Sequence, residues 1–292
     1  MIDLIIPTLS QGLLWSLLAL GVYITFRVLD FADMTVEGSF PLGAAICVYF
    51  LIRDHHPLLA LLAAGLLGGV AGIVTGLLHT KLRIPSLLAG ILSMIALYSV
   101  NLRIMGKANV SLLGKETAFT YMETLGLDYA QSVFIVGLLA TVVVGTLIYW
   151  FFGTEIGAAI RATGFNPQMI RAQGIDTNVM LLLGLFLSNA LTAMAGAFIG
   201  MNNGFFDVGM GVGTIVIGLA SVIIGEVLFG TRSFKNSLVS VILGSIVYRF
   251  VIAIVLQMGM PPNDLKLFTS VLVVIALALP MMRDKVQRRK VG

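Results

Sequence analysis

Polar side chains gather in a short stretch that leads directly into an apolar run. They are Asp33, Thr35, Glu37 and Ser39. Carboxylates and hydroxyls in this pattern can bind a polar solute or carry protons if they lie within a membrane, where such groups are costly and mark functional pathways. The stretch would then belong to a substrate pathway. The alternative, which the residues support equally well, is a solvated turn over residues 27–37.

Other polar residues interrupt long apolar runs further along the chain. Ser188 and Asn189 lie in the middle of one run, and Arg249 lies within another. Ser188 and Asn189 can contact a substrate, although hydrogen bonding between helices, worth about 0.6–2 kcal/mol, is the favoured interpretation. Arg249 can attract a substrate carboxylate near an outer gate, or extend its side chain to the membrane interface.

The chain lacks the motifs that would support catalysis or a bound cofactor. It contains no G-x-x-x-x-G-K-[ST], no H-E-x-x-H and no G-x-S-x-G sequence. The three histidines have no companions at metal-ligand spacing, and the single cysteine, Cys47, excludes an internal disulfide or a thiolate cluster. We therefore expect no catalytic residue, no metal site and no cofactor bound by this chain.

The composition indicates the environment in which these polar groups lie. Hydrophobic residues make up 58% of the 292 residues and charged residues only 11%, whereas a soluble domain has about 25% charged residues. A disordered chain would be polar and rich in charge. The net charge of +4 comes mostly from the last ten residues, which argues against a nucleic-acid partner. These values predict an all-α polytopic membrane protein with a single transmembrane domain over 1–292.

Nine apolar segments can account for the crossings, since a helix needs about 20 mostly apolar residues to span the hydrocarbon core. They cover residues 4–26, 38–52, 58–78, 84–102, 133–152, 178–199, 213–230, 236–256 and 267–282. The second segment is short of a full crossing, so it can be half of a broken helix.

The distribution of Lys and Arg predicts the orientation. If the basic tail at 283–292 is cytoplasmic, nine crossings place the N-terminus outside. Twelve Lys and Arg residues then lie on the cytoplasmic side and five on the outer side. This asymmetry supports a multi-pass membrane protein whose C-terminus is cytoplasmic and whose N-terminus is outside.

The two halves of the chain resemble each other at an offset of 175 residues. The offset superimposes Phe31 on Phe206 and Gly38 on Gly213. It also lays the early spans over the late ones, so that 1–102 and 178–282 form two repeat halves of opposite orientation. Inverted repeats are typical of transporters, with the substrate path at their interface. Chance similarity among abundant glycines is the alternative.

The loop over 153–177 predicts two short helices on the cytoplasmic side. The first covers 155–163 and ends at Gly164. Asn166 caps the second, Pro167 opens it and Gly174 ends it. Four apolar side chains can serve for contacts: Ile160, Phe165, Ile170 and Ile175. A helix pair of this kind suits docking into another protein, although an ordinary structured loop is equally consistent with the residues.

The pattern G-x-x-I-R-A-x-G-x-N-x-x-x-x-R-x-x-G-I over 157–175 resembles the coupling loop of ABC importer permeases of the ribose and branched-chain amino acid type. Residues 33–40, 82–92 and 195–225 resemble further parts of that family in the same order. The chain departs from the sugar-type members because it lacks an extra first span. The resemblance implies that the matched loop residues contact an ATPase: Gly157, Arg161, Ala162, Gly164, Asn166, Arg171 and Gly174.

The resemblance also implies a location in the bacterial inner membrane, the partners and the activity. A separate cytoplasmic ABC ATPase would use ATP and Mg, an extracytoplasmic solute-binding protein or lipoprotein would deliver the solute, and a second permease copy would complete a homodimer within membrane lipid. The stretch at 33–40 is similar to a subgroup that serves amino acids, some of them aromatic. A permease for a sugar or nucleoside is one alternative. An ion-coupled secondary transporter, with Asp33, Glu37 or Glu226 carrying protons, is another.

Overall fold

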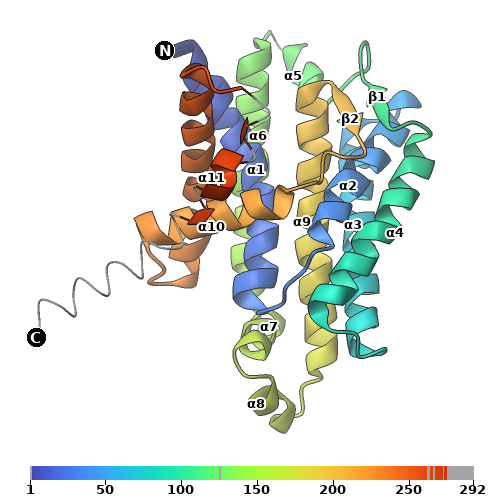
Figure 1. The fold of residues 1–292 in the computed structure, drawn as a ribbon, viewed down its shortest axis with the longest axis vertical. Coiled ribbons are helices and arrows are strands. Elements are labelled where there is room, and N and C mark those ends of the chain that lie inside the picture. The colour runs from blue at the N-terminus through green and yellow to red at the C-terminus, as the bar shows by residue number, and fades with distance from the viewer. Residues whose placement is uncertain (1, 125, 262–263, 266, 272, 275–292) are drawn as a thin grey trace, which may run out of the picture.

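The structure, a computed structural model, describes residues 2–124, 126–261, 264–265, 267–271 and 273–274. The helices are α1 (Ile2–Tyr23), which continues as the π-helix η1 (Ile24–Val28), α2 (Val36–Ile52), α3 (Pro57–Thr80), α4 (Ser86–Met105), α5 (Thr120–Glu123), α6 (Tyr129–Phe152), α7 (Glu155–Phe165), α8 (Pro167–Ala172), α9 (Thr177–Asn203), α10 (Thr214–Phe229) and α11 (Phe234–Gln257). The strands are β1 (Asn109–Ser111) and β2 (Phe205–Asp207). Figure 1 shows the long helices side by side.

Within the described part of the chain, six helices are long and apolar enough to cross a membrane, and α2 and α10 are shorter apolar helices. The protein is therefore a mostly helical, polytopic membrane protein. Eight of the nine predicted segments coincide with one of these helices to within a few residues. The ninth, at 267–282, lies mostly outside the described residues, as does the whole basic tail at 283–292. Nine crossings thus stay a prediction.

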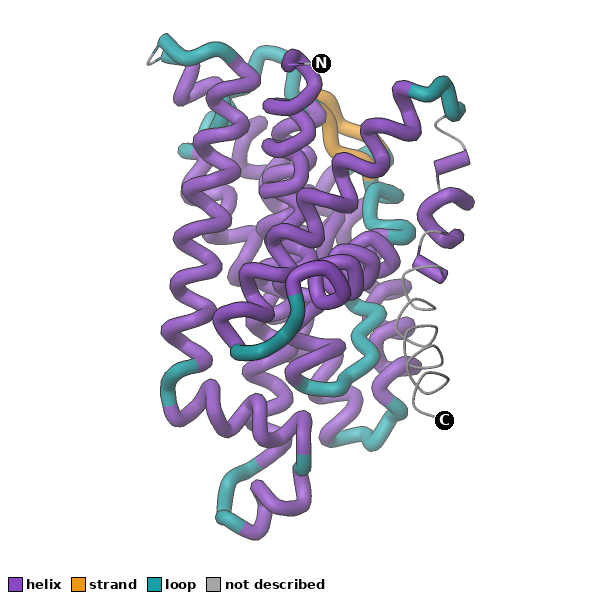
Figure 2. Tube along the Cα trace, turned by 90° about the vertical axis from the view of Figure 1, so that its left-hand side faces the viewer, coloured by secondary structure: helices purple, strands orange, loops and turns teal. Residues whose placement is uncertain are grey.

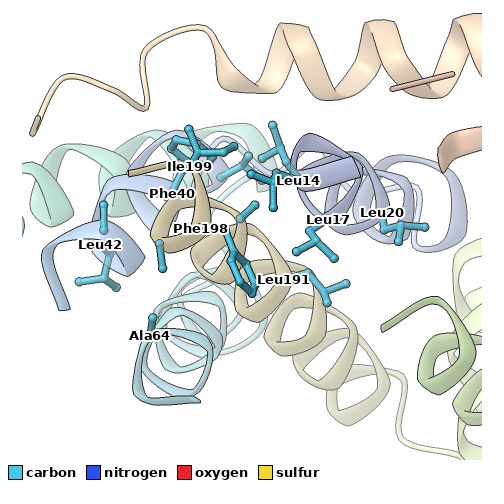
Figure 3. Packing of buried hydrophobic residues seen from close by; sticks show 14 of the residues in the cluster. Leu14, Leu17, Leu20, Phe40, Leu42, Ala64, Leu191, Phe198 and Ile199 are labelled. Atoms are coloured by element: carbon cyan, nitrogen blue, oxygen red, sulfur yellow. The ribbon is translucent and has the colours of Figure 1, made fainter. Parts of the chain in front are cut away.

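Helix α9 is the centre of the packing and contacts α1, α2 and α3. Three glycines of α3 permit its close approach: a Cβ atom on Gly68 would lie 2.2 Å from the Ala193 Cβ, one on Gly72 would lie 2.3 Å from the Leu185 carbonyl oxygen, and Gly76 faces the same helix. Lipid is as apolar as these side chains, so close packing rather than hydrophobic burial stabilises such contacts. Figure 3 shows part of the same core around Leu14, Leu17, Phe198 and Ile199.

The chain between η1 and α2 is mostly buried and not helical. After η1 the backbone turns at Asp30, which has a positive φ of 51°, and Figure 1 shows it returning from the end of α1 to the start of α2. Asp30 itself is exposed, but Phe31, Asp33 and Thr35 are buried. This contradicts the alternative of a solvated turn over 27–37, because α2, α3 and α9 surround the end of the stretch. Residues 27–52 therefore form an interrupted helical segment.

Side-chain contacts join the helix ends at the end of the molecule that carries α7 and α8. Arg27 forms an ion pair with Glu226 of α10, Phe31 packs edge to face on His79 at the end of α3, and α7 lies against η1. The connections in this region carry seven basic residues: Arg27, Lys81, Arg83, Arg161, Arg171, Arg232 and Lys235.

The opposite end contains one short two-stranded ladder, which the sequence did not predict and which leaves the fold all-α in character. β1 and β2 pair antiparallel, with Val110 opposite Phe206. The long connection after α4 thereby finds backbone partners in the link between α9 and α10. Lys115 adds an ion pair of 2.7 Å with Asp54 at the same end.

The helix positions agree with the predicted repeat offset. The starts of α9, α10 and α11 follow those of α1, α2 and α3 by 175, 178 and 177 residues. Figure 1 shows α1 and α9 running in opposite directions. The offset and the directions agree with an inverted repeat, which itself stays a prediction.

Candidate functional site

A polar cluster begins where the helical path is interrupted before α2. The Oδ1 atom of Asp33 accepts a hydrogen bond of 2.9 Å from the backbone N–H of Thr35. This is the local turn that Asp favours, and it satisfies a donor just ahead of the first turn of α2. The same carboxylate is fully buried, so its second oxygen requires a donor from another element.

Asn189 of α9 supplies that donor. Its amide nitrogen donates to the Oδ2 atom of Asp33 at 2.8 Å and to the carbonyl oxygen of Leu185 at 3.0 Å. Its side-chain oxygen accepts a short hydrogen bond from the Ser39 hydroxyl. Asp33, Ser39 and Asn189 all have a relative exposure of 0%. One amide thus joins the interrupted segment, α2 and α9 in a closed hydrogen-bond network.

Hydroxyl groups extend this network to α3 and α4. The hydroxyls of Thr35 and Thr75 share a hydrogen bond of 2.7 Å, and Thr75 donates to the Ser93 hydroxyl at 2.7 Å. Asn101 of α4 donates to the backbone oxygen of Gly38 at 3.1 Å. The result is a buried polar cluster, which we define as Asp33, Thr35, Ser39, Thr75, Ser93 and Asn189.

Four of the seven residues predicted for the substrate pathway meet in the buried polar cluster, and the other three do not. Glu37 accepts a 2.9 Å hydrogen bond from the backbone N–H of Gly213, just before α10. Ser188 donates to the Gly21 carbonyl oxygen of α1 at 2.8 Å. The Arg249 guanidinium lies 3.9 Å from the centre of the Trp15 ring.

Sequence reasoning did not single out Thr75 and Ser93. Thr75 directly precedes Gly76, one of the small residues through which α3 approaches α9. A hydroxyl beside a glycine ladder is a usable signal, because a face that admits close approach brings its polar groups to the neighbouring helix. Ser93 offers no comparable pattern.

The groups of the buried polar cluster satisfy one another's hydrogen-bonding capacity. Its donors and acceptors bond to one another across four helical elements, and no cation pairs with Asp33 among the described residues. The described residues contain no group of three metal-ligating side chains. In this conformation the cluster is closed, so a solute would reach it only after α2 and α9 move apart.

A second candidate site is the connection between α6 and α9, where α7 and α8 project beyond the long helices (Figures 1 and 2). Thr154 caps α7 by accepting a hydrogen bond of 3.3 Å from Gly157 N–H. Asn166 caps α8 by accepting one of 3.1 Å from Met169 N–H, which confirms the predicted cap. The predicted end of the first helix at Gly164 is wrong, because α7 continues to Phe165.

The two faces of the α7–α8 pair differ sharply. Ile160 is fully buried and Ile170 nearly so, which anchors the pair to the helix ends. Phe165 is 92% exposed, and Ile156 and Met169 are also exposed. A large aromatic side chain held in this way on a projecting element is typical of a surface that binds another protein.

The residues predicted to contact an ATPase mostly shape the loop. A Cβ atom on Gly164 would lie 1.9 Å from the Val28 carbonyl oxygen, and one on Gly157 would lie 2.3 Å from that of Phe151. Arg171 donates to the Thr177 hydroxyl at 2.7 Å. Arg161 points back to the Phe234 ring, with 5.1 Å between its Cζ atom and the ring centre. Ala162 is half-buried, and Gly174 has a positive φ of 83°.

Comparison with known proteins gives concordant matches. A family model described as the permease component of branched-chain amino acid transport systems matches residues 4–278. The chain is 40% identical over 274 residues to a tyrosine transport system permease protein of Clostridioides difficile, covering 94% of this chain and 90% of that protein. It is 32% identical over 288 residues to an uncharacterized protein of Rickettsia prowazekii, covering 97% and 99%. An autoinducer 2 import system permease protein of Salmonella typhimurium is 26% identical over 225 residues, covering 75% and 61%. No solved structure matches the chain.

Proposed function

The chain belongs to the family of permease components of branched-chain amino acid transport systems, and from this premise we propose that it carries an aromatic amino acid into a bacterial cell. As an ABC importer permease it is a membrane subunit without an enzymatic role of its own. The proposed solute is tyrosine or a close analogue. Support comes from the relative at 40% identity, whose name specifies tyrosine transport.

A solute of another class is the second candidate. The autoinducer 2 permease is less similar, at 26% identity, and this chain covers only 61% of it. In that case the solute would be a sugar or a nucleoside. The higher identity and fuller coverage of the tyrosine permease favour the amino acid.

The exposed Phe165 carries the proposal of ATP coupling. In the proposed complex, the α7–α8 pair inserts Phe165 and Met169 into a groove of a cytoplasmic ATPase, which binds ATP and Mg. The residues that match the family pattern hold the pair in shape: Gly157, Arg161, Ala162, Gly164, Asn166, Arg171 and Gly174. Closure of the ATPase pair would push on Gly164 and hence on η1, because α7 packs on the Val28 carbonyl group.

The proposed pathway opens at the buried polar cluster. When α2 separates from α9, the groups freed from one another become donors and acceptors for the solute: Asp33, Thr35, Ser39 and Asn189. Such a change needs only two arrangements of the same helices, each favoured by different contacts. The present contacts of Glu37, Ser188 and Arg249 suit helix joining, and a pathway role for them stays a prediction.

The proposed assembly is a homodimer in the inner membrane, with an extracytoplasmic solute-binding protein or lipoprotein on the other face. The end that carries α7 and α8 would face the cytoplasm together with the C-terminus, and the N-terminus would lie outside. The seven basic residues gathered near that end support this orientation.

Reconstitution tests the proposal directly. The permease would be purified with its co-purifying ATPase, placed in liposomes and supplied with the matching binding protein and labelled tyrosine or ribose. We expect tyrosine uptake that requires ATP, ignores protonophores and exceeds ribose uptake. Uptake without ATP that collapses with a protonophore would instead establish an ion-coupled transporter, and ribose uptake alone would overturn the proposed solute.

A further inference from the structure

Two hollows on the surface meet at the end of α6. The first is a basic notch of about 480 Å³, lined by the end of α6, the start of α7 and the start of α11. The second is an apolar groove of about 730 Å³ between α3, α6 and α9. Trp150 and Phe152 line both hollows. The basic notch and the apolar groove therefore adjoin at these two side chains.

The basic notch holds two cations that the described part of the chain does not neutralise. Arg161 and Lys235 line it, and neither forms an ion pair with a described carboxylate. The Arg161 Nε atom is buried without a hydrogen-bond partner. A buried guanidinium donor without an acceptor is costly, and an anionic oxygen bound in the notch would supply that acceptor. Thr154, the N-cap of α7, and Phe234, the first residue of α11, also line the notch, and helix N-termini favour anions.

The apolar groove has the character of an acyl-chain site. Leu139, Val143 and Leu147 of α6 line it and are exposed at the surface. From Val143 to Phe152 the helix rises about 14 Å, close to half of the about 30 Å hydrocarbon thickness. One acyl chain of a single leaflet fits this length. Trp150, 69% exposed at the junction, lies where aromatic residues meet the headgroup region.

We propose that the two hollows together form a binding site for an anionic phospholipid. Its phosphate lies between Arg161 and Lys235, and one acyl chain extends along the α6 side of the groove. A free phosphate would satisfy the cations but would leave the groove unfilled. A second permease copy that packed through this same surface would fill the groove. It would not neutralise the notch, because the residues that line the two hollows include no carboxylate. Basic pockets beside spanning helices are a known setting for anionic headgroups.

The site also affects the α7–α8 pair, through which the proposed ATP coupling acts. Arg161 belongs to α7, whereas Lys235 belongs to α11, so a bound phosphate bridges the projecting pair to the last long helix described in full. This consequence rests on the proposed ATP coupling, whereas lipid binding does not. The test is therefore a binding measurement that needs neither ATP nor solute.

Tryptophan fluorescence can report the bound lipid, because the sequence has only two tryptophans. In the Trp15→Phe protein, Trp150 is the single reporter at the junction of notch and groove. The detergent-purified full chain would be titrated with brominated phosphatidylglycerol and, separately, with brominated phosphatidylcholine. We expect phosphatidylglycerol to quench Trp150 at a concentration at least about fivefold lower than that of phosphatidylcholine. The reason is that each basic residue favours an anionic lipid by about that factor.

Variants then test the assignment of the cations. Lys235→Gln and Arg161→Gln should each remove most of the preference for phosphatidylglycerol. Arg232→Gln is the matched control and should retain the preference. Arg232 is exposed on the turn between α10 and α11, three residues before Lys235, but does not line the notch. Lys235→Gln keeps the test valid if Arg161→Gln fails to fold.

The remaining outcomes would each overturn the proposal. Equal quenching by the two lipids would exclude an anionic site. Loss of the preference in millimolar inorganic phosphate would indicate a free-anion site. Absence of quenching by either lipid, together with a dimer on size-exclusion chromatography, would place a second copy in the groove. None of these outcomes depends on transport activity.

Discussion

The side chain of Asn189 holds the carboxylate of Asp33 at 2.8 Å, although the two residues are 156 positions apart. Both are fully buried, and Asp33 receives its other hydrogen bond from its own turn. Asn189 is therefore the contact through which the interrupted segment before α2 is tied to the central helix α9. A solute that enters between these elements has to replace this hydrogen bond.

Replacing Asn189 by Leu should leave a buried carboxylate oxygen without a donor. The penalty for such a group is at least about 2 kcal/mol, so we expect a clear fall in the midpoint of thermal unfolding in detergent, together with loss of uptake. Ser188→Ala is the matched control. It removes one hydrogen bond between helices, typically worth about 0.6 kcal/mol, and should change the midpoint little.

Exchanging the side chains of Asp33 and Asn189 distinguishes loss of their specific contact from a general loss of stability. Asn189→Asp alone places two carboxylates together and should destabilise the protein. Addition of Asp33→Asn restores one amide and one carboxylate, and we expect it to recover most of the lost stability. If the double variant is no more stable than Asn189→Asp, the contact does not have the assigned role.

Gly164 lies where α7 touches η1, the continuation of the first long helix. A Cβ atom there would lie 1.9 Å from the Val28 carbonyl oxygen, which no real side chain tolerates. Gly164→Ala should therefore displace α7 from η1, lowering both the unfolding midpoint and the ATP-driven uptake. Gly145→Ala provides the control, since its Cβ atom would meet only the Ile242 Cδ1 atom, at 3.7 Å. Equal behaviour of the two variants would contradict the close packing.

Hydrophobic runs predicted most of the fold because lipid imposes a simple rule on them. A spanning helix needs length and low polarity, and both properties are visible in the sequence. The α6 and α9 segments are correct to within a few residues for this reason. The pairing of β1 with β2 could not be predicted, because it depends on which loops meet after the helices have packed.

The buried polar cluster was predicted in part. Asp33 and Asn189 stand out as polar groups beside or within apolar runs, but their contact is not visible in the sequence, since nothing local specifies a partner so far along the chain. Gly164 was misread for the opposite reason. Glycine commonly ends a helix, whereas here its missing side chain serves a helix contact, which only the packed structure reveals.

Arg249, which lies inside the long apolar helix α11, contacts Trp15 of α1. The guanidinium lies 3.9 Å from the ring centre, and a partly desolvated cation–π pair is worth about 1–2 kcal/mol. Arg249→Gln should lower the unfolding midpoint and leave the KM for uptake unchanged. A double-variant cycle with Trp15→Leu checks this, because the two losses should not add. A raised KM at unchanged stability would instead assign Arg249 to the substrate pathway.

Variants of Phe165 and Ile160 can distinguish an effect on ATPase coupling from an effect on stability. The two residues lie on the same helix, but Phe165 is exposed and Ile160 is buried. Phe165→Ala should leave the unfolding midpoint of the isolated permease unchanged, since it removes no contact within the chain. In the assembled importer it should weaken retention of the ATPase during purification and lower ATP-driven uptake at least tenfold.

Ile160→Ala should have the opposite effect on the isolated permease, which it should destabilise. Removal of a buried isoleucine side chain costs about 2–5 kcal/mol, so the isolated permease itself should unfold at a lower temperature. If Phe165→Ala keeps both the ATPase and the uptake, the exposed face of α7 does not couple the two subunits. The remaining explanation would then be a contact through α8, which Met169→Ala tests in the same purification.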